Sequence, residues 1–144
     1  MSILVDVPIG LPTDGKRACD VKAKEKLARH QRSVFYTPIR AAVYSQNIDE
    51  AKATNEKRAG FSIQNQAWGI VPRIREVDEF LDANPGARDR LYETHPEVCF
   101  YSLNGQTPLD SSKTTGYGFR ERKSLLVDES SEAKEIIDEC LPRY

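Results

Sequence analysis

The sequence has few of the residues that build metal centres or disulfide frameworks. Among 144 residues there are two histidines, three cysteines and one tryptophan, and no two cysteines are spaced as CxxC. A structural zinc site needs about four ligands. His95 and Cys99 share a helical spacing but do not suffice for one. An odd number of scattered cysteines predicts a reduced, cytoplasmic protein without a disulfide framework.

Long apolar runs are missing as well. No stretch approaches the ~18 consecutive apolar residues of a membrane span, so we expect no association with a membrane. The first residues carry no basic segment ahead of their short apolar run, which argues against a secretory signal. The length, with 39% hydrophobic and 30% charged residues, predicts a single folded domain over residues 1–144.

Charge is nearly balanced overall but unevenly distributed. The formal net charge is −1, which argues against a protein that binds nucleic acid through bulk charge. Residues 16–40, however, carry eight basic side chains against two acidic ones, and residues 128–139 are mostly acidic. The basic segment is either a solvated helix face attracted to the acidic one or a track for a phosphate backbone.

The pattern of apolar residues predicts a helix-rich α/β fold. Residues 3–7, followed by Pro8, predict a short buried strand, and residues 90–93 predict a second. Residues 33–36 predict a further extended piece before Pro38. We therefore expect a small sheet of two to three short strands covered by several helices.

The helices are predicted from helical periodicity and from capping residues. Asn47 and Glu50 predict a helix start, and Gly60 a helix end. The last helix places Cys140 and Leu141 on its apolar face. The predicted ranges are 16–30, 38–46, 48–59, 66–83, 94–103, 116–127 and 131–141.

Asp6 is the most informative single residue. It stands within an apolar run at the end of the first predicted strand. A buried carboxylate is costly unless it is paired, hydrogen-bonded or bound to a metal, and α/β folds place their sites at strand ends. Asp6 is therefore a candidate metal ligand. Alternatively, its carboxylate accepts hydrogen bonds from the turn that follows.

Residues 93–97, Glu-Thr-His-Pro-Glu, follow the second predicted strand and open a helix. Thr94 and Glu97 have the spacing of a capping box, in which Glu97 would bond the backbone of Thr94. Glu93, at a strand end, has no such structural role. Both interpretations stay open: a helix cap, or a site that uses Glu93 and Glu97 with His95 beside them.

Two further acids lie beside predicted apolar helix faces. Asp20 precedes Leu27 by seven residues, and Asp78 follows Ile74 by four. Each is a candidate for a supporting carboxylate that orients another site residue. For Asp20, the alternative is an ion pair with Lys24 on the same helix.

A loop rich in hydroxyl groups precedes the predicted helix over residues 116–127. Residues 111–116 read Ser-Ser-Lys-Thr-Thr-Gly, and the helix carries Arg120 and Arg122. Hydroxyls, Lys113 and free backbone N–H groups at a helix start suit a phosphate, although GxxxxGK[ST] of a Walker loop is absent. The alternative is a capped, solvent-exposed loop.

In order along the chain, these motifs resemble an uncharacterised prokaryotic family of predicted nucleases with a ribonuclease-H-like fold. Residues 5–12, VDVPIGLP, are similar to the family's signature, and residues 17–20, RACD, to its R-x-C-D. The other similar segments are residues 33–38, residues 64–78 with Arg73 in place of a lysine, ETHPEVCF at 93–100, and Ser112, Lys113, Gly116, Arg120 and Arg122.

The resemblance implies a domain in which clustered carboxylates hold two Mg²⁺ or Mn²⁺ ions. Carried onto the matching positions, it implies metal-binding catalytic residues Asp6, Glu93 and Glu97, phosphate-binding Lys113, Arg120 and Arg122, and supporting Asp20, His95 and Asp78. The family usually has a strand hairpin with an aspartate before this first strand, and a late acidic motif. This sequence lacks both, so we expect a truncated ribonuclease-H-like domain with weak or absent activity.

Two hypotheses about function follow. In the first, the chain is a metal-dependent nuclease or phosphodiesterase that acts on nucleic acid. In the second, it is a non-catalytic remnant that binds a small anion or a protein partner. Glu93 and Glu97 pointing away from a shared site would count against the first. The strand at residues 3–7 should lie at a sheet edge, which predicts a homo-oligomer formed through that edge.

Overall fold

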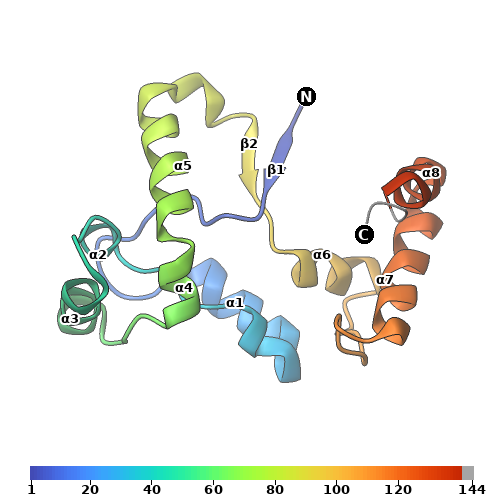
Figure 1. Cartoon of the computed structure of the whole chain (residues 1–144), viewed down its shortest axis with the longest axis horizontal. Coiled ribbons are helices and arrows are strands. Elements are labelled where there is room, and N and C mark those ends of the chain that lie inside the picture. Colours follow the sequence, from blue (N-terminus) through green and yellow to red (C-terminus); the bar gives the residue numbers. More distant parts are fainter. Residues whose placement is uncertain (141–144) are drawn as a thin grey trace.

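The computed structural model of the chain describes residues 1–140 and has an α/β fold with a small parallel sheet (Figure 1). β1 (Ile3–Val5) pairs with β2 (Leu91–Glu93), so that Val5 stands opposite Glu93. Because the pairing is parallel, the carboxyl ends of both strands meet at one edge. Asp6 follows β1 and Glu93 ends β2 at that edge.

Helices account for most of the remaining described chain, close to the predicted ranges. Leu141, predicted to end the last helix, lies outside the described residues. The α-helices are α1 (Ala18–Leu27), α2 (Arg40–Val43), α3 (Ile48–Ala59), α4 (Asn65–Gly69), α5 (Val71–Ala83), α6 (Pro96–Leu103), α7 (Gly116–Glu129) and α8 (Ser131–Cys140). Two 3₁₀ segments, η1 (Ala28–Ser33) and η2 (Pro85–Ala87), complete the order.

Local signals set several helix ends as predicted. The side chain of Asn47 accepts a hydrogen bond from the Glu50 N–H at the start of α3, and Gly60 ends that helix in a left-handed conformation at φ +75°. The predicted helix over residues 66–83 is instead divided at Ile70 into α4 and α5. Pro72 lies in the first turn of α5, where its missing N–H costs nothing.

The first strand is not buried as predicted. The exposed fractions of Ile3 and Leu4 are 46% and 65%. β1 has a neighbouring strand on one side only, and the apolar residues that follow it, Val7 and Leu11, make the contact with the core instead. The prediction of a core strand at residues 3–7 is therefore wrong.

The core lies among the helices rather than on the sheet. One cluster is Ile39, Ala42, Ala51, Ile63 and Ala67, and a second is Val43, Val71 and Ile74. Trp68 packs against both clusters. Both polar atoms of the buried Asn55 side chain form hydrogen bonds. Its Oδ1 accepts from the Ile39 N–H and its Nδ2 donates to the Phe61 carbonyl, both at 2.8 Å.

The helices form two groups on either side of the sheet ends (Figure 1). α2 to α5 contact one another on one side, and α7 and α8 pack together on the other. α1 contacts α6 between them, and α6 contacts α7. No helix within residues 1–140 combines the length and apolar character needed to cross a bilayer.

Candidate functional site

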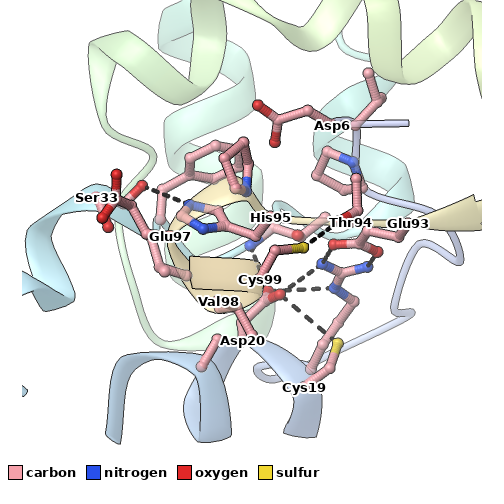
Figure 2. Close-up of a pocket in the computed structure, with 18 of the residues that line it drawn as sticks. Asp6, Cys19, Asp20, Ser33, Glu93, Thr94, His95, Glu97, Val98 and Cys99 are labelled. Carbon is pink, nitrogen blue, oxygen red and sulfur yellow. Dashed lines mark hydrogen bonds and ion pairs between the residues drawn. The ribbon is translucent and has the colours of Figure 1, made fainter. Parts of the chain in front are cut away.

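A pocket of about 590 Å³ lies where the two strands end, and residues of α1 and α6 contribute to its wall (Figure 2). Six of the nine residues singled out from the sequence line this pocket: Asp6, Asp20, Glu93, His95, Glu97 and Lys113. Asp78, Arg120 and Arg122 do not. The pocket also has apolar lining, from Val34, Phe35 and Val98 among others.

Asp6 lies at this pocket but is exposed rather than buried. Its burial was predicted from the apolar run around it, and that prediction is wrong because β1 itself is exposed. Its carboxylate makes no hydrogen bond or ion pair with any residue that the structure describes, and no dashed line reaches it in Figure 2. The expected hydrogen bonds from the following turn are therefore not formed.

Glu93 points from the end of β2 to Arg17, which immediately precedes α1. The two guanidinium nitrogens Nη1 and Nη2 donate to Oε2 and Oε1 of Glu93, each at 2.7 Å. The Ile9 N–H also donates to Oε2, at 2.8 Å, and Arg17 donates to the Ile9 carbonyl at 2.9 Å. Glu93 thus ties β2 to the turn after β1.

Asp20 shares the same arginine. Its exposed fraction is 4%, and Arg17 donates to Oδ1 at 2.5 Å and to Oδ2 at 3.2 Å. The Thr37 N–H donates to Oδ2 at 2.8 Å. Burial alone would lower the pKa of Arg17, but hydrogen bonds to Glu93 and Asp20 outweigh it and raise that pKa. Arg17 therefore stays charged between two carboxylates, and the ion pair with Lys24, the alternative considered for Asp20, is not formed.

Glu97 is held by Arg122, from α7. Nη2 of Arg122 donates to Oε2 of Glu97 at 2.8 Å and Nε donates to Oε1 at 3.3 Å, and each side chain is 10% exposed. Glu97 therefore does not cap Thr94, and His95 rather than Thr94 precedes α6. Arg122, a predicted phosphate ligand, is committed to this buried pair.

His95 and Thr37 each leave a buried polar atom unpartnered. His95 Nε2 lies 3.1 Å from the Ser33 carbonyl oxygen, which can only accept, so Nε2 carries the proton of that bond. His95 Nδ1 and Thr37 Oγ1 have no hydrogen-bond partner within residues 1–140. The exposed fraction of Thr37 is 1%. Both residues line the pocket, but these two atoms are covered by the protein itself and do not face its open volume.

Two free cysteines also line the pocket. Burial raises the pKa of the Cys19 thiol, and the nearby Arg17 only partly offsets that effect. A raised pKa leaves less thiolate, so Cys19 is a poor nucleophile. Cys99 Sγ lies 2.9 Å from Thr94 Oγ1.

The remaining predicted residues lie elsewhere. Asp78, on α5, accepts from Arg40 at 2.6 and 2.8 Å and from the Tyr44 hydroxyl at 2.9 Å, so it joins α5 to α2. Arg120 is exposed on α7. Lys113 is exposed at the pocket and forms no ion pair within the described chain.

The residues present do not fit a two-metal centre. A hard divalent cation needs several oxygen ligands converging on one point, and among the described residues no three His, Cys, Asp or Glu side chains are placed to hold one ion. Glu93, Asp20 and Glu97 are each bonded to an arginine instead. Asp6 is the one pocket carboxylate without such a partner in the part of the chain described.

Two residues that shape the pocket were not identified as site residues from the sequence. Arg17 was counted only within the basic segment and the R-x-C-D motif, although its spacing of three residues from Asp20 permits an ion pair on one helical turn. No motif in the sequence points to Thr37, because its hydroxyl lacks a partner only as a result of its burial in the folded protein.

Comparison with known proteins identifies a family but no relative of established activity. No curated protein and no solved structure matches the chain. One family model, described as a protein of unknown function (DUF429), matches residues 1–141. That match spans nearly the whole sequence, and the chain belongs to the DUF429 family.

Proposed function

We propose that the pocket at the strand ends binds a nucleotide unit, and that the chain acts by binding rather than by two-metal hydrolysis. The observation that carries this proposal is the lining of one pocket, which combines apolar side chains with two exposed charged groups, Asp6 and Lys113, that have no ion-pair partner within the described chain. A nucleotide offers complementary groups to all of them.

The size and lining of the pocket favour a ligand with three kinds of surface. A volume of about 590 Å³ lies in the range of small-molecule sites. The apolar side chains offer a face to a flat ring, the exposed Asp6 carboxylate accepts hydrogen bonds, and the Lys113 ammonium attracts a phosphate. A nucleotide carries all three: base, hydrogen-bond donors and phosphate.

The acids in the pocket leave a net negative charge, since Glu97 is balanced by Arg122 but Asp20 and Glu93 share the one charge of Arg17. Asp6 keeps an uncompensated charge near the strand ends, where the donor groups of a base can meet it. The phosphate is therefore assigned to the side of the pocket lined by Lys113.

A second candidate is a metal-dependent nuclease with a ribonuclease-H-like fold. The observation that favours it is the parallel register, which places Asp6 and Glu93 at the ends of adjacent strands. It requires Arg17 and Arg122 to release Glu93 and Glu97 before those carboxylates can meet a cation.

Calorimetric titration with a nucleoside monophosphate tests the binding proposal. We expect saturable binding that weakens by about tenfold in Lys113→Ala, since a charged hydrogen bond is worth about 1.5 kcal/mol or more. Lys134→Ala, which removes an exposed lysine from α8, is the matched control. No detectable binding, or an equal loss in the control, would contradict the proposal.

Nuclease assays with Mn²⁺ separate the two candidates. The binding proposal expects no cleavage of labelled single- or double-stranded oligonucleotides by the wild-type protein. Mn²⁺-dependent cleavage that is abolished in Asp6→Asn, with the fold intact by circular dichroism, would support the nuclease instead. The Lys134→Ala variant again serves as the control.

We further propose that the chain forms a homo-oligomer through the free edge of β1 and acts in a reducing compartment. Ile3, Leu4 and Tyr92 are exposed on the sheet, and an unpaired strand edge can pair with another chain. Free Cys19 and Cys99 suit a reducing environment.

A further inference from the structure

A second cavity, of about 780 Å³, lies between η1 and the start of α4. Its lining consists of cationic and amide side chains without a carboxylate: Lys24, Arg29, Gln31, Arg32, Gln64 and Gln66. Such a lining repels cations and offers hydrogen-bond donors to anionic oxygens. The first pocket, in contrast, is lined by four carboxylates.

The two arginines are the cations that this cavity offers to a ligand. The Lys24 ammonium is already held by the Gln31 carbonyl, at 3.0 Å, and by the Val34 carbonyl. Arg32 is exposed and makes no ion pair within residues 1–140. Arg29 pairs with Asp110, but the exposed fractions of these side chains are 56% and 87%. A pair so exposed contributes little, and a phosphate can displace it.

The second cavity lies beside the first along the chain. Arg32 lines the second cavity and the next residue, Ser33, lines the first, and the same holds for Lys24 and Ala23. The Ser33 carbonyl is also the partner of His95. The two cavities therefore lie against neighbouring residues of α1 and η1.

The ring of Tyr36, near this cavity, favours a ligand that is bound through its phosphate backbone rather than through its bases. The Tyr36 ring lies under two ammonium groups, with Lys16 Nζ 4.2 Å and Lys24 Nζ 4.9 Å from its centroid. A ring covered in this way is not free to stack on a base. The surface thus presents charge and amides, which recognise phosphate and sugar without reading sequence.

We infer that the surface formed by η1 and the start of α4 binds the phosphate backbone of a polynucleotide, with Arg29 and Arg32 as its cationic contacts. This inference extends the proposed function and rests on it. The first pocket would hold one nucleotide of the same polynucleotide. Binding at this surface should be salt-dependent and nearly independent of base sequence.

Fluorescence anisotropy with a labelled single-stranded oligonucleotide of mixed sequence tests the inference. Arg29→Ala combined with Arg32→Ala should weaken binding about tenfold or more, and should reduce the slope of log K against log salt by about 0.7 for each lost phosphate contact. The matched control is Arg58→Ala with Arg73→Ala, which removes two exposed arginines from α3 and α5. The control should bind like the wild-type protein.

The outcomes separate this surface from the pocket. Oligonucleotide binding that is unchanged in the Arg29/Arg32 variant, or reduced equally in the control, overturns the inference. If mononucleotide binding in the pocket persists meanwhile, the proposed function stands alone. If oligonucleotide binding depends on Arg29 and Arg32 while no mononucleotide binds, the surface stands and the pocket proposal fails. Binding to anionic phospholipid vesicles without oligonucleotide binding would assign the surface to a membrane and overturn the inference.

Discussion

Arg17 connects three separate parts of the chain. Its guanidinium bonds Asp20 in α1, Glu93 at the end of β2 and the carbonyl of Ile9 in the turn after β1. Five donors in a planar fork allow these contacts at once, which a lysine ammonium cannot reproduce. A single residue thus decides that two acids at the pocket act as structural partners of an arginine rather than as metal ligands.

Gly118, in the first turn of α7, is required by close backbone approach. A Cβ at this position would lie 2.8 Å from the Ser112 carbonyl carbon and closer still to its oxygen. Backbone atoms cannot swing aside as a flexible side chain can. We expect Gly118→Ala to destabilise the protein by about 1–3 kcal/mol, the usual cost of overpacking, measured by urea unfolding.

Gly116→Ala is the control for that prediction. The nearest atom to a Cβ at Gly116 is Arg120 Nη1 at 3.7 Å, an ordinary contact with a mobile group. Its unfolding free energy should stay within about 0.5 kcal/mol of wild type, as for most surface substitutions. Equal stability of the two variants would show that Ser112 does not approach α7 as described.

At the scale of elements, α6 and α7 are joined by the buried pair of Glu97 and Arg122. Removing one partner leaves a buried charge, so Arg122→Met should cost about 3–5 kcal/mol. Replacing both, in Glu97→Leu with Arg122→Met, should restore most of that loss because no charge stays unpaired. Urea unfolding of the single and double variants measures this coupling.

An exposed ion pair on α5 serves as the control for the buried pair of Glu97 and Arg122. Arg73 and Glu76 form an ion pair on α5 with exposed fractions of 71% and 60%, and Arg73→Ala should leave the free energy of unfolding nearly unchanged. If Arg122→Met were as mild as Arg73→Ala, the α6–α7 pair would not be buried as described.

The hydrogen bond from Tyr44, which follows α2, to Asp78 of α5 makes the free energy of unfolding depend on pH in the alkaline range. Burial and the hydrogen bond to Asp78 raise the pKa of Tyr44 from 10.0 to about 12. The folded protein therefore keeps this proton at pH values where the unfolded chain loses it. Its contribution to stability is fully present below pH 10 and is lost as the pH rises to about 12.

Urea unfolding between pH 9 and pH 12 measures this effect. The wild-type protein should lose more stability over that interval than Tyr44→Phe, which has no hydroxyl to titrate. Because the chain has six tyrosines, the ionisation of Tyr44 is measured as the difference in phenolate absorbance near 295 nm between the wild-type protein and Tyr44→Phe. Parallel pH profiles for the two proteins would contradict the predicted role of Tyr44.

At the scale of the whole molecule, the sheet is the least covered part of the structure. It has two strands, both of them edges, and carries exposed Ile3, Leu4 and Tyr92. Pairing with a second copy would cover these side chains and satisfy the free backbone groups of β1. We expect self-association that increases with concentration, measured by light scattering coupled to size exclusion.

Leu4→Lys should shift that equilibrium towards the monomer, since a lysine on an edge strand opposes strand pairing. Phe80→Lys, which places the same charge at another exposed apolar position, separates an effect of β1 from a general effect of charge. A wild-type protein that stays monomeric at high concentration would contradict the proposal of a homo-oligomer.

Local sequence patterns were enough to predict most of the order of elements and the signals at their ends. The Asn47 cap and the left-handed Gly60 lie where the sequence predicts them, because each depends on contacts within a few residues. The two strands were also predicted, although their parallel pairing was not. Six of nine candidate residues line one pocket, and the parallel pairing accounts for Asp6 and Glu93, which lie at the carboxyl ends of the two strands.

Which charges are paired and which apolar residues are covered could be learned only from the folded chain. Arg17 meets Glu93 across 76 positions and Arg122 meets Glu97 across 25, and nothing in local spacing specifies such partners. The apolar run at residues 3–7 likewise could not reveal that β1 has one neighbour and lies exposed. Periodicity and capping are local interactions, whereas burial and distant ion pairs depend on how the whole chain packs.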